Sequence, residues 1–561
     1  MSALSESFAT IFSKGRYYVP EYQRMYTWTA REINYFSEDI FNFCDSSVSA
    51  EEKYLLGQII INKVTIKNKD ETTTTFLYVV DGQQRLATST IFACILYNKL
   101  KKFDEKSHRD FSLCRNTLEG VIGFETSGYK LTMSSLNKDY FHHFVQNGEL
   151  DYECTQVNNR IKEAYERLDV SIENYTKGNI NTLVKLIKCF TGQLEVSVLE
   201  TSDEKWAFTL FERLNTRGKP LVLADLLKNH VFSIIDSSSE DLKTKWSNMI
   251  IELSKIHVDD PSGYIRYYWN SFNANTTEGK VYEKIIEYYR KKGTSDFYDF
   301  IRALCDNVGI YCKLSNADYS STIFDAAGVD YIRLLVANGQ RTFIPLILAL
   351  VLKGESASSV DRVLSNIVRL AIRCSVCHSN PNQLEKKYSE FAKKYTDGEF
   401  TIDKICEEIQ KMVPDDHTLK ESFSTFSIKD NDVAKLYLKT MYATNYGEGE
   451  LIVNPDGKEI QLEHIMPKSN RKWKVPEDIH KEYLYRFGNM TLLKRYPNEK
   501  NGNNLFKEKR NEYASSRILY TSRLTQYETW GTDSIERNQS QYYLDFIKTW
   551  PYTEKDDSEG E

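Results

Sequence analysis

The chain has 561 residues, of which 41% are hydrophobic and 27% are charged. These fractions are ordinary for folded protein, and they exclude a wholly disordered or fibrous chain. At roughly 150 residues per domain, the length predicts about three to four domains. The sequence contains no apolar run of about 18 residues, so we expect no transmembrane helix.

Charge is distributed unevenly along the chain. The net charge is −6, which argues against a general nucleic-acid coat. Between Lys458 and Arg523, however, 15 Lys and Arg stand against eight Asp and Glu, a local charge of +7. A basic region on an acidic chain predicts one domain that contacts DNA or RNA; the alternative is an ordinary solvated surface.

Two further features fit a cytoplasmic protein. The ten Cys residues follow no regular framework, which is typical of reduced thiols. The segment from Met1 to Ser13 lacks the basic-then-apolar order of a signal peptide.

The first 100 residues alternate strand-like runs with turns. Apolar runs at 55–61 and 76–80 predict two strands, and the polar residues 67–75 between them predict a hairpin loop. Asp81-Gly82 ends the second run, and apolar residues then recur at helical spacing up to Leu100. We therefore expect a strand–turn–helix unit over 76–100.

The rest of the chain is expected to be mainly helical. Strand-like exceptions lie at 194–199 and 460–462. Helices are expected at 203–214, capped by Ser202 or Asp203, and at 223–232, 281–290, 296–304, 360–372 and 433–441. The pattern predicts three domains, with boundaries at 1–235, 236–425 and 426–561.

A possible phosphate site lies where the strand at 76–80 opens into a helix. Its residues are Asp81-Gly82-Gln83-Gln84-Arg85. Backbone amides at a helix start favour anions, and an Arg in the first turn can bind phosphate bidentately. Asp81 can hold a metal or act as a base, and both Gln side chains can orient water or a phosphate oxygen. The alternative is a plain strand–helix turn with a surface Arg.

Two other segments combine aromatic, amide and cationic side chains. One is 19–28, in which Tyr22, Gln23 and Arg24 can stack a base or close a phosphate pocket; the alternative is an aromatic core segment. The other is 211–220, in which Asn215 stands near two cations and is followed by Asp225 and Lys228. It can touch a nucleotide or a neighbouring domain, or it can simply end a helix at Gly218.

The basic region holds the parts of a one-metal nuclease. Glu463-His464 follows the strand at 460–462, and Asn489, Asn498 and Lys509 come later. We expect His464 to take a proton from water, Asn489 to hold its imidazole, and Lys509 to contact a neighbouring phosphate. Glu463 and Asn498 are the expected ligands of a cation on the scissile phosphate, with Glu463 the weaker candidate because its neighbour His464 must enter the same cleft.

Taken together, these motifs resemble the GmrSD-like type IV restriction family. The N-terminal matches are Pro20-x-Tyr22-Gln23-Arg24-x-Tyr26-x-Trp28, Leu56-Gly57, Asp81-Gly82-Gln83-Gln84-Arg85-Leu86 and Phe211-x-x-Leu214-Asn215-x-x-Gly218-x-x-Leu221-x-x-x-Asp225. The C-terminal matches are Glu463-His464-Ile465-x-Pro467, Gly488-Asn489-x-Thr491-Leu492-Leu493, Asn498 and Phe506-x-x-Lys509.

The resemblance implies an α+β multidomain protein with three parts. These are a ParB/sulfiredoxin-like nucleotide-binding domain, a mainly α-helical middle and a C-terminal ββα-metal (HNH) nuclease domain. The cofactor-binding residues would be Asp81, Gly82, Gln83, Gln84, Arg85, Tyr22, Gln23, Arg24 and Asn215. Because Asn498 stands where many HNH nucleases have His, we expect Mg²⁺ or Mn²⁺ rather than Zn²⁺.

The implied function is a cytoplasmic, nucleotide-regulated endonuclease that cuts modified phage DNA in antiviral defence. It would use a nucleoside triphosphate, and a homo-oligomer is compatible with the sequence. One alternative is a nucleotide-dependent DNA-sensing regulator with an inactive nuclease fold, although competent residues fill positions 464, 489 and 498. Another is an RNase effector with the same site. The sequence leaves open which modification and which nucleotide are recognised.

Overall fold

The computed structural model forms two compact units. The first comprises Met1–Arg266 and Thr277–Gly309, and the second comprises Tyr267–Thr276 and Ile310–Glu561. The structure describes residues 2–20, 23, 25–46, 49, 51–67, 73–123, 128–155, 158–203, 206–207, 222–234, 240–258, 260–319, 323–379, 384–447, 460–495, 498 and 502–553. Over these residues, no helix is both long enough and apolar enough to cross a membrane.

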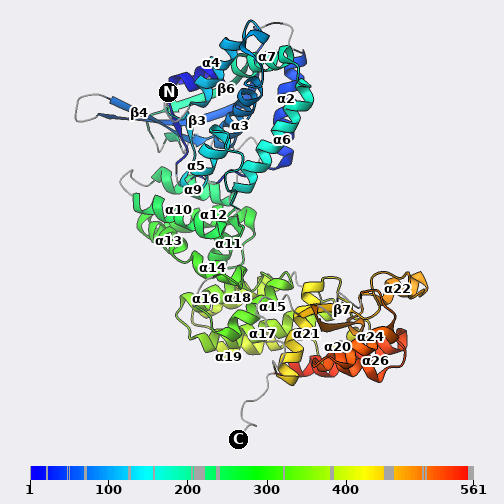
Figure 1. Cartoon of the computed structure of the whole chain (residues 1–561). Helices are drawn as coiled ribbons and strands as arrows, with labels where there is room; N and C mark the ends of the chain where they lie inside the picture. Colours follow the sequence, from blue (N-terminus) through cyan, green and yellow to red (C-terminus); the bar gives the residue numbers. More distant parts are fainter. Residues whose placement is uncertain are drawn as a thin grey trace. The chain divides into compact units, whose positions relative to one another are not determined.

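A mixed six-stranded sheet organises the first unit, in the order β1-β6-β3-β4-β2-β5. β3 pairs antiparallel with β4 and parallel with β6, while β2 lies parallel to both β4 and β5. The strands are β1 (Ser2–Ser7), β2 (Tyr17–Tyr18), β3 (Tyr54–Lys67), β4 (Thr73–Asp81), β5 (Leu131–Thr132) and β6 (Leu194–Thr201) (Figure 1).

Helices cover one face of this sheet. The central one, α3 (Gln83–Leu100), is buried along nearly its whole length, which is typical of a helix that is apolar on most sides. It packs against α4 and α6, and its apolar residues join Ile61 and Val79 of the sheet in one core. The other described α-helices of this part are α1 (Phe8–Lys14), α2 (Ala30–Ser46), α4 (Phe111–Ile122), α5 (Ser135–Tyr140), α6 (Asn159–Thr176) and α7 (Ile180–Lys188) (Figure 1).

A group of helices completes the first unit. α9 packs against α12, and α10 packs against α13. The helices are α9 (Leu223–Ile234), α10 (Glu240–Ser254), α11 (Ser262–Asn270), α12 (Glu278–Lys292), α13 (Thr294–Asp306) and α14 (Val308–Ser315). A boundary between the units falls within α11 and another within α14, so the predicted helical middle 236–425 contributes to both units.

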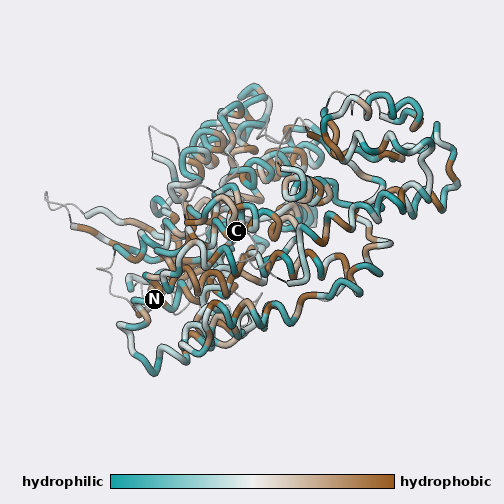
Figure 2. Tube along the Cα trace, turned by 90° about the horizontal axis from the view of Figure 1, so that it is seen from below, coloured by the Kyte–Doolittle hydropathy of each residue, from teal (hydrophilic) through white to brown (hydrophobic). Residues whose placement is uncertain are grey.

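Among the described residues of the second unit, helices predominate and one antiparallel strand pair is present. β7 (Ile460–His464) pairs with β8 (Met490–Lys494). Along many helices, brown and teal segments alternate, as amphipathic packing requires (Figure 2). The helices are α15 (Ala326–Ala337), α16 (Ile344–Leu352), α17 (Ala357–Val376), α18 (Leu384–Thr396), α19 (Ile402–Gln410), α20 (Asp416–Phe423), α21 (Asn431–Tyr446), α22 (Glu477–Tyr483), α24 (Phe506–Ala514), α25 (Leu519–Ser522) and α26 (Thr532–Thr549), with short 3₁₀ turns at η7 (Phe487–Asn489) and η8 (Arg523–Gln526).

Most of the predicted elements are confirmed. The hairpin strands are β3 and β4, the following helix is α3, and the strands expected at 194–199 and 460–462 are β6 and β7. The helix predicted at 203–214 falls largely outside the described residues, but Asp203 Oδ1 accepts a hydrogen bond from Trp206 N at 3.1 Å, as expected of a cap. The α+β class is therefore correct.

Candidate functional site

Three of the sequence motifs meet at the carboxyl end of β4. Gln23 Nε2 donates to Val80 O at 2.9 Å, and Lys228 Nζ donates to Gln23 Oε1 at 2.9 Å. Lys228 also lies 3.6 Å from Asp225, one turn earlier on α9. Both residues act electrostatically on Asp81. We call this group the β4-end cluster and define it as Gln23, Asp81, Arg85, Asp225 and Lys228.

The cluster pairs two carboxylates with two cations. Burial raises the pKa of Asp81 above its usual value, and this is opposed by the Gly82 N–H at 2.7 Å and by the charges of Arg85 and Lys228. With every group ionised, the four charges cancel. Burial thus favours the uncharged form of Asp81, and a protonated Asp81 would leave the cluster with one net positive charge, which suits an anion.

Gly57 leaves the space that the Arg85 side chain occupies in this cluster. Arg85 Nη1 donates to Gln58 O at 2.7 Å, so the guanidinium rests against β3. At Gly57, where φ is 124°, an added Cβ would lie 2.8 Å from Arg85 Cζ. A side chain there would displace the guanidinium, which gives the Leu56-Gly57 motif a physical reason.

Gln84 does not have the role predicted from the sequence. Its Nε2 donates to Met25 O at 2.9 Å, and its Oε1 accepts from Thr27 N at 2.9 Å. Both ends of the amide are therefore occupied, and Gln84 holds the 25–27 segment rather than orienting water or phosphate. Tyr26 and Trp28 belong to the core, which was the alternative interpretation of the 19–28 segment. Tyr26 is buried with its hydroxyl 2.7 Å from Thr88 Oγ1, and Trp28 packs on the core.

Not every predicted residue of this site can be placed. Tyr22, Arg24 and Asn215 lie outside the described residues. Gln83 is buried in the first turn of α3. Gly82 begins that turn in the left-handed region, with φ 90°.

In the second unit, Glu463 and Lys509 form a buried ion pair. Lys509 Nζ lies 2.7 Å from Glu463 Oε1, and the two side chains are 0% and 5% exposed. Lys509 also donates to the carbonyl oxygens of His464 and Ile465, and Tyr513 Oη donates to Glu463 Oε1 at 2.9 Å. These contacts correct two expectations: Lys509 does not face a phosphate, and Glu463 is turned into the core as the partner of Lys509.

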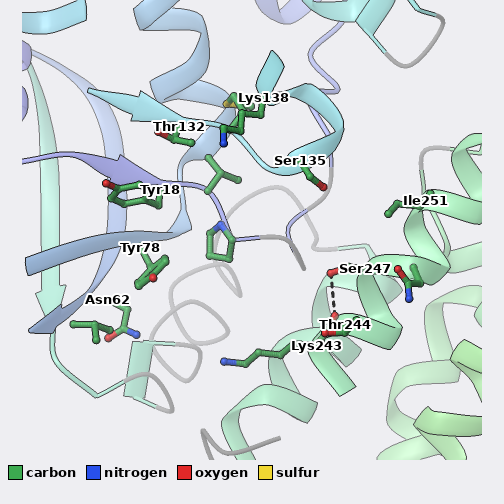
Figure 3. A pocket seen from close by; sticks show the side chains of 15 residues that line it. Tyr18, Asn62, Tyr78, Thr132, Ser135, Lys138, Lys243, Thr244, Ser247 and Ile251 are labelled. Atoms are coloured by element: carbon green, nitrogen blue, oxygen red, sulfur yellow. Dashed lines mark hydrogen bonds between the residues drawn. The ribbon is translucent and has the colours of Figure 1, made fainter. Parts of the chain in front are cut away.

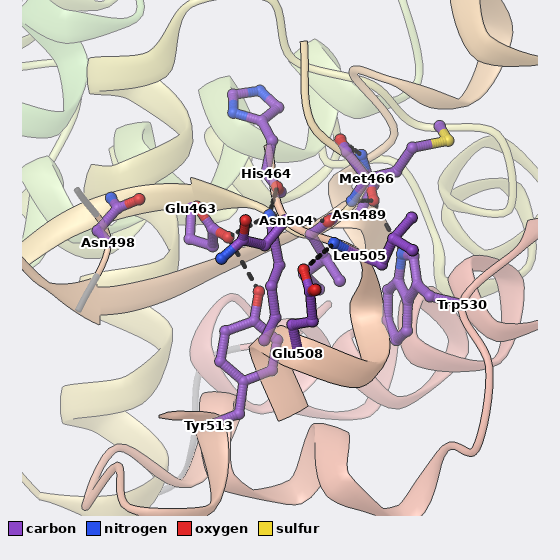
Figure 4. Close-up of polar contacts among 12 residues, drawn as sticks. Glu463, His464, Met466, Asn489, Asn498, Asn504, Leu505, Glu508, Tyr513 and Trp530 are labelled. Carbon is purple, nitrogen blue, oxygen red and sulfur yellow. Dashed lines mark hydrogen bonds and ion pairs between the residues drawn. The ribbon is translucent and has the colours of Figure 1, made fainter. Parts of the chain in front are cut away.

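His464 points the other way from its strand neighbour. Successive side chains of a strand alternate between faces, and Figure 4 shows the imidazole directed away from Glu463 and Tyr513. His464 is 8% exposed, and its Nε2 is buried without a hydrogen-bond partner among the described residues. Burial, with help from the charges of Lys468 and Lys509, lowers its pKa to about 4. The imidazole is therefore neutral at physiological pH, with one ring nitrogen free of a proton, and the lowered pKa makes it a weaker base than an ordinary imidazole.

Asn489 positions the backbone beside His464 rather than the imidazole itself. Its Oδ1 accepts from Met466 N at 2.8 Å and from Trp530 Nε1 at 3.0 Å. Its Nδ2 donates to the carbonyl oxygens of Met466 and Leu484, both at 3.0 Å. All four hydrogen bonds of the amide are thus used, and the expected bond to the imidazole is wrong.

Asn498 lies against the edge of β7. Its Nδ2 donates to Gln461 Oε1 at 3.1 Å and to Leu462 O at 3.2 Å. The amide oxygen makes no hydrogen bond with the described residues and can serve as a ligand. However, the described residues contain no group of three or more His, Cys, Asp or Glu that could hold a metal ion, and Glu463 is paired with Lys509. The predicted pair of ligands, Glu463 and Asn498, therefore does not fit a metal beside His464 in this arrangement.

A cationic loop follows directly after His464. It carries four exposed cations, at Lys468, Arg471, Lys472 and Lys474. Two hydrogen bonds between Asn470 and Val475 close the loop. Asn470 Nδ2 donates to Val475 O at 2.6 Å, and Val475 N donates to Asn470 Oδ1 at 3.0 Å. Lys468 is close enough to His464 for its charge to help lower the pKa of the imidazole.

Sequence reasoning missed two supporting residues. Tyr513 lies four residues after Lys509 on α24 and therefore on the same helix face, a spacing that could have indicated it. Trp530 contacts Asn489 although the two are 41 residues apart in the sequence, and no local sequence pattern predicts that contact.

Comparison with known proteins places both ends of the chain in one family. A family model for the N-terminal domain of the GmrSD restriction endonuclease matches residues 8–232, and a model for the C-terminal domain of GmrSD restriction endonucleases matches residues 413–543. No curated protein matches the chain. The two matched domains follow in the order that the sequence motifs indicated and together span more than half of the chain; the chain therefore belongs to the GmrSD restriction endonuclease family.

Proposed function

We propose that this chain is a nucleotide-regulated, modification-dependent DNA endonuclease of antiviral defence, with its hydrolytic site at His464. The observation that carries the proposal is the state of that side chain. It is neutral at physiological pH, and its buried Nε2 has no partner within the described residues. A buried polar atom without a partner is costly; in the tautomer with the proton on Nδ1, Nε2 is an acceptor, and a bound water would supply the missing hydrogen bond.

In the proposed reaction, His464 Nε2 takes a proton from a water molecule whose oxygen attacks the scissile phosphorus. The P–O bond to the leaving sugar oxygen then breaks, and that oxygen acquires a proton from solvent. Asn489 supports this step by fixing the backbone at Met466, two residues after His464. General-base catalysis of this kind typically contributes about 10²–10⁴ in rate.

The cationic loop supports DNA as the substrate. Exposed Lys and Arg side chains bind the phosphates of a strand without reading its sequence. Lys468 and Arg471 stand four and seven residues after His464, where they can hold the backbone next to the scissile bond. We also propose that cleavage requires Mg²⁺ or Mn²⁺, although Glu463 and Asn498 do not fit as its ligands in this arrangement.

The β4-end cluster is proposed to bind the phosphates of a nucleoside triphosphate. Arg85 and Lys228 supply the cations, and protonation of Asp81 or its displacement by phosphate would give the cluster a net positive charge. The cluster lies at the start of α3, where backbone N–H groups also favour an anion.

The nuclease proposal is tested by replacing His464. His464→Ala should lower the rate of plasmid or phage-DNA cleavage at least 100-fold, the lower end of a general-base contribution. His417→Ala, at an exposed position in the same unit, is the matched control and should cut normally. Reactions are run with modified phage DNA, unmodified DNA and RNA, each with Mg²⁺, Mn²⁺ or chelator.

Each outcome of that experiment has a meaning. Cleavage by His464→Ala near the wild-type rate would remove the active site from β7. Cleavage of RNA alone would favour the RNase alternative, and the absence of any cleavage by the wild type would favour a regulatory protein. Full activity in chelator would contradict the metal requirement.

The nucleotide proposal is tested at Arg85. Arg85→Ala removes a charge-assisted contact of about 1.5–3 kcal/mol, so the affinity for ATP or GTP measured by calorimetry should fall about tenfold or more. Arg109→Ala, at an exposed position in the same unit, is the control. Equal affinities for the Arg85 variant and the wild type would contradict the nucleotide site.

A further inference from the structure

A cavity of about 600 Å³ lies in the first unit on the face of the sheet opposite its core. Tyr17, Leu77 and Val79 are buried in the core, so their strand neighbours Tyr18 and Tyr78 point to the opposite face. The cavity is bounded by that face, by the start of α5 and by α10 (Figure 3). We call it the sheet pocket; no residue of the β4-end cluster lines it.

The floor of the sheet pocket is a row of residues in register across four strands. Asn62 pairs with Tyr78, Tyr78 with Tyr18, and Tyr18 with Thr132. Their side chains therefore share one face. The rings of Tyr18 and Tyr78 lie 6.0 Å apart at 47°, and both are partly exposed to the pocket. Because the rings are inclined to one another, a flat heterocycle can stack on one of them and contact the other.

Asn62 adds a polar group that lacks a partner. Its side chain is 4% exposed, and its Oδ1 makes no hydrogen bond within the described residues although it is buried. A buried amide oxygen without a partner costs free energy unless a ligand donates to it. Because Asn62 lines the pocket beside Tyr78, the missing donor fits an N–H group on a heterocycle stacked on the tyrosines.

Two lysines stand on opposite sides of the same cavity. Lys138 reaches into it from α5, and Lys243 reaches into it from α10 (Figure 3). Hydroxyl groups of Ser135 and Ser247 lie on the same two walls. The pocket thus has an aromatic floor, one buried acceptor and a cation on each side.

We propose that the sheet pocket receives a single nucleotide that is swung out of a DNA strand, with its base stacked on the ring of Tyr18 or Tyr78. The base would donate a hydrogen bond to Asn62 Oδ1, and the phosphates on either side would contact Lys138 and Lys243. This proposal rests on the proposed function, because it makes the pocket the place where the enzyme inspects a base for modification. A cavity of this volume lies within the range of small-molecule sites, and enzymes that act on a base take it out of the stack into such a pocket.

The placement of the cations favours a nucleotide in a strand over a free triphosphate. A triphosphate concentrates its charge at one end and calls for clustered cations or backbone amides. In the sheet pocket, the lysines come from different helices on opposite walls. Such spacing matches the phosphates that precede and follow one nucleotide.

Photocrosslinking to the full-length protein tests the proposal directly. The probe is a 15-nucleotide single-stranded DNA with one central 5-iododeoxyuridine, bound in chelator so that it is not cut. After irradiation, the crosslinked peptides are identified by mass spectrometry. We expect crosslinks at Tyr18 or Tyr78, because the iodinated base would lie against these rings.

Variants separate stacking and charge from general DNA binding. Tyr78→Ala should weaken probe capture at the pocket roughly 5- to 150-fold, the range for loss of one stacked base, whereas Tyr78→Phe should retain it. Lys243→Ala should also weaken capture. Lys255→Ala, about three turns further along the chain and outside the pocket, should not.

The results distinguish failure of this proposal from failure of the proposed function. Crosslinks confined to other peptides, such as the loop after His464, would overturn the pocket assignment while leaving the nuclease intact. Free 5-iododeoxyuridine monophosphate that competes as well as the oligonucleotide would overturn binding in a strand. Crosslinks at Tyr18 or Tyr78 in a wild type that cuts no DNA would support the pocket and contradict the nuclease.

Discussion

At the scale of single residues, the structure gives several residues of the nuclease motif roles that differ from those predicted from the sequence. His464 remains the candidate base because its imidazole is neutral and its Nε2 lacks a partner among the described residues. Glu463, Asn489 and Lys509 instead build the frame around it, through a buried ion pair and four hydrogen bonds of one amide. Residues of one motif can thus be required for different reasons, some for chemistry and some for folding.

The ion pair leads to a prediction about stability. Lys509→Met leaves the Glu463 carboxylate buried without a cation, which should lower the free energy of unfolding of the second unit by about 3–5 kcal/mol. The double variant Glu463→Gln with Lys509→Met should recover part of this loss, because no buried charge remains. Urea denaturation followed by tryptophan fluorescence measures both.

Lys507→Met is the matched control for this prediction. It makes the same change two residues away on α24, at an exposed position, and should alter the unfolding free energy by less than about 0.5 kcal/mol. If Lys509→Met proved as mild as Lys507→Met, the ion pair would not matter for folding, and the earlier phosphate-contacting assignment of Lys509 would regain support.

At the scale of elements, the junction between β4 and α3 determines where the β4-end cluster forms. Gly82 turns the chain there with φ 90°, a conformation that residues with a Cβ rarely adopt. An added Cβ would also lie 2.5 Å from Ile59 Cγ2 on the neighbouring strand β3. The glycine is therefore needed for both backbone conformation and space.

We predict that Gly82→Ala lowers the stability of the first unit by about 1–3 kcal/mol and weakens nucleotide binding, because Asp81 and Arg85 flank the distorted turn. The control is Gly120→Ala, in the helix α4 with open space around the new Cβ, which should stabilise by about 0.5–1 kcal/mol. Thermal melting and calorimetry provide the readouts. A Gly82→Ala protein as stable as the Gly120→Ala protein would contradict the close approach to β3.

At the scale of the whole molecule, the first unit extends beyond the residues matched by the N-terminal family model. That match ends at 232, and the domain predicted from sequence ends at 235, yet Thr277–Gly309 belongs to the same unit. α9 carries the buried residues Leu227 and Val231, and His230 contacts the rings of Tyr282 and Phe297. Helices after 235 therefore cover part of the apolar surface of α9.

From this we predict different behaviour for two fragments. Residues 1–309 contain the complete first unit and should be monodisperse in size-exclusion chromatography, with a single cooperative melt. Residues 1–235 expose the apolar face of α9, so they should aggregate or melt at a lower temperature. A 1–235 fragment as stable and monodisperse as 1–309 would instead support the domain boundary predicted from sequence.

Local sequence by itself determined the elements and the location of the candidate sites. Strand-length runs and helical patterns placed β3, β4, α3, β6 and β7, because the neighbours that create these patterns are only a few residues apart. The motifs likewise indicated the family, the turn at Asp81-Gly82 and the base candidate His464.

Only the tertiary structure decided what these side chains contact. The partners of Lys509 and Gln84, and the row formed by Asn62, Tyr78, Tyr18 and Thr132, join residues that are tens of positions apart. Such contacts depend on strand register and on which helix covers which face. A shift of one residue would turn Tyr78 into the core and Val79 into the pocket, and no local pattern specifies that register without the packed sheet.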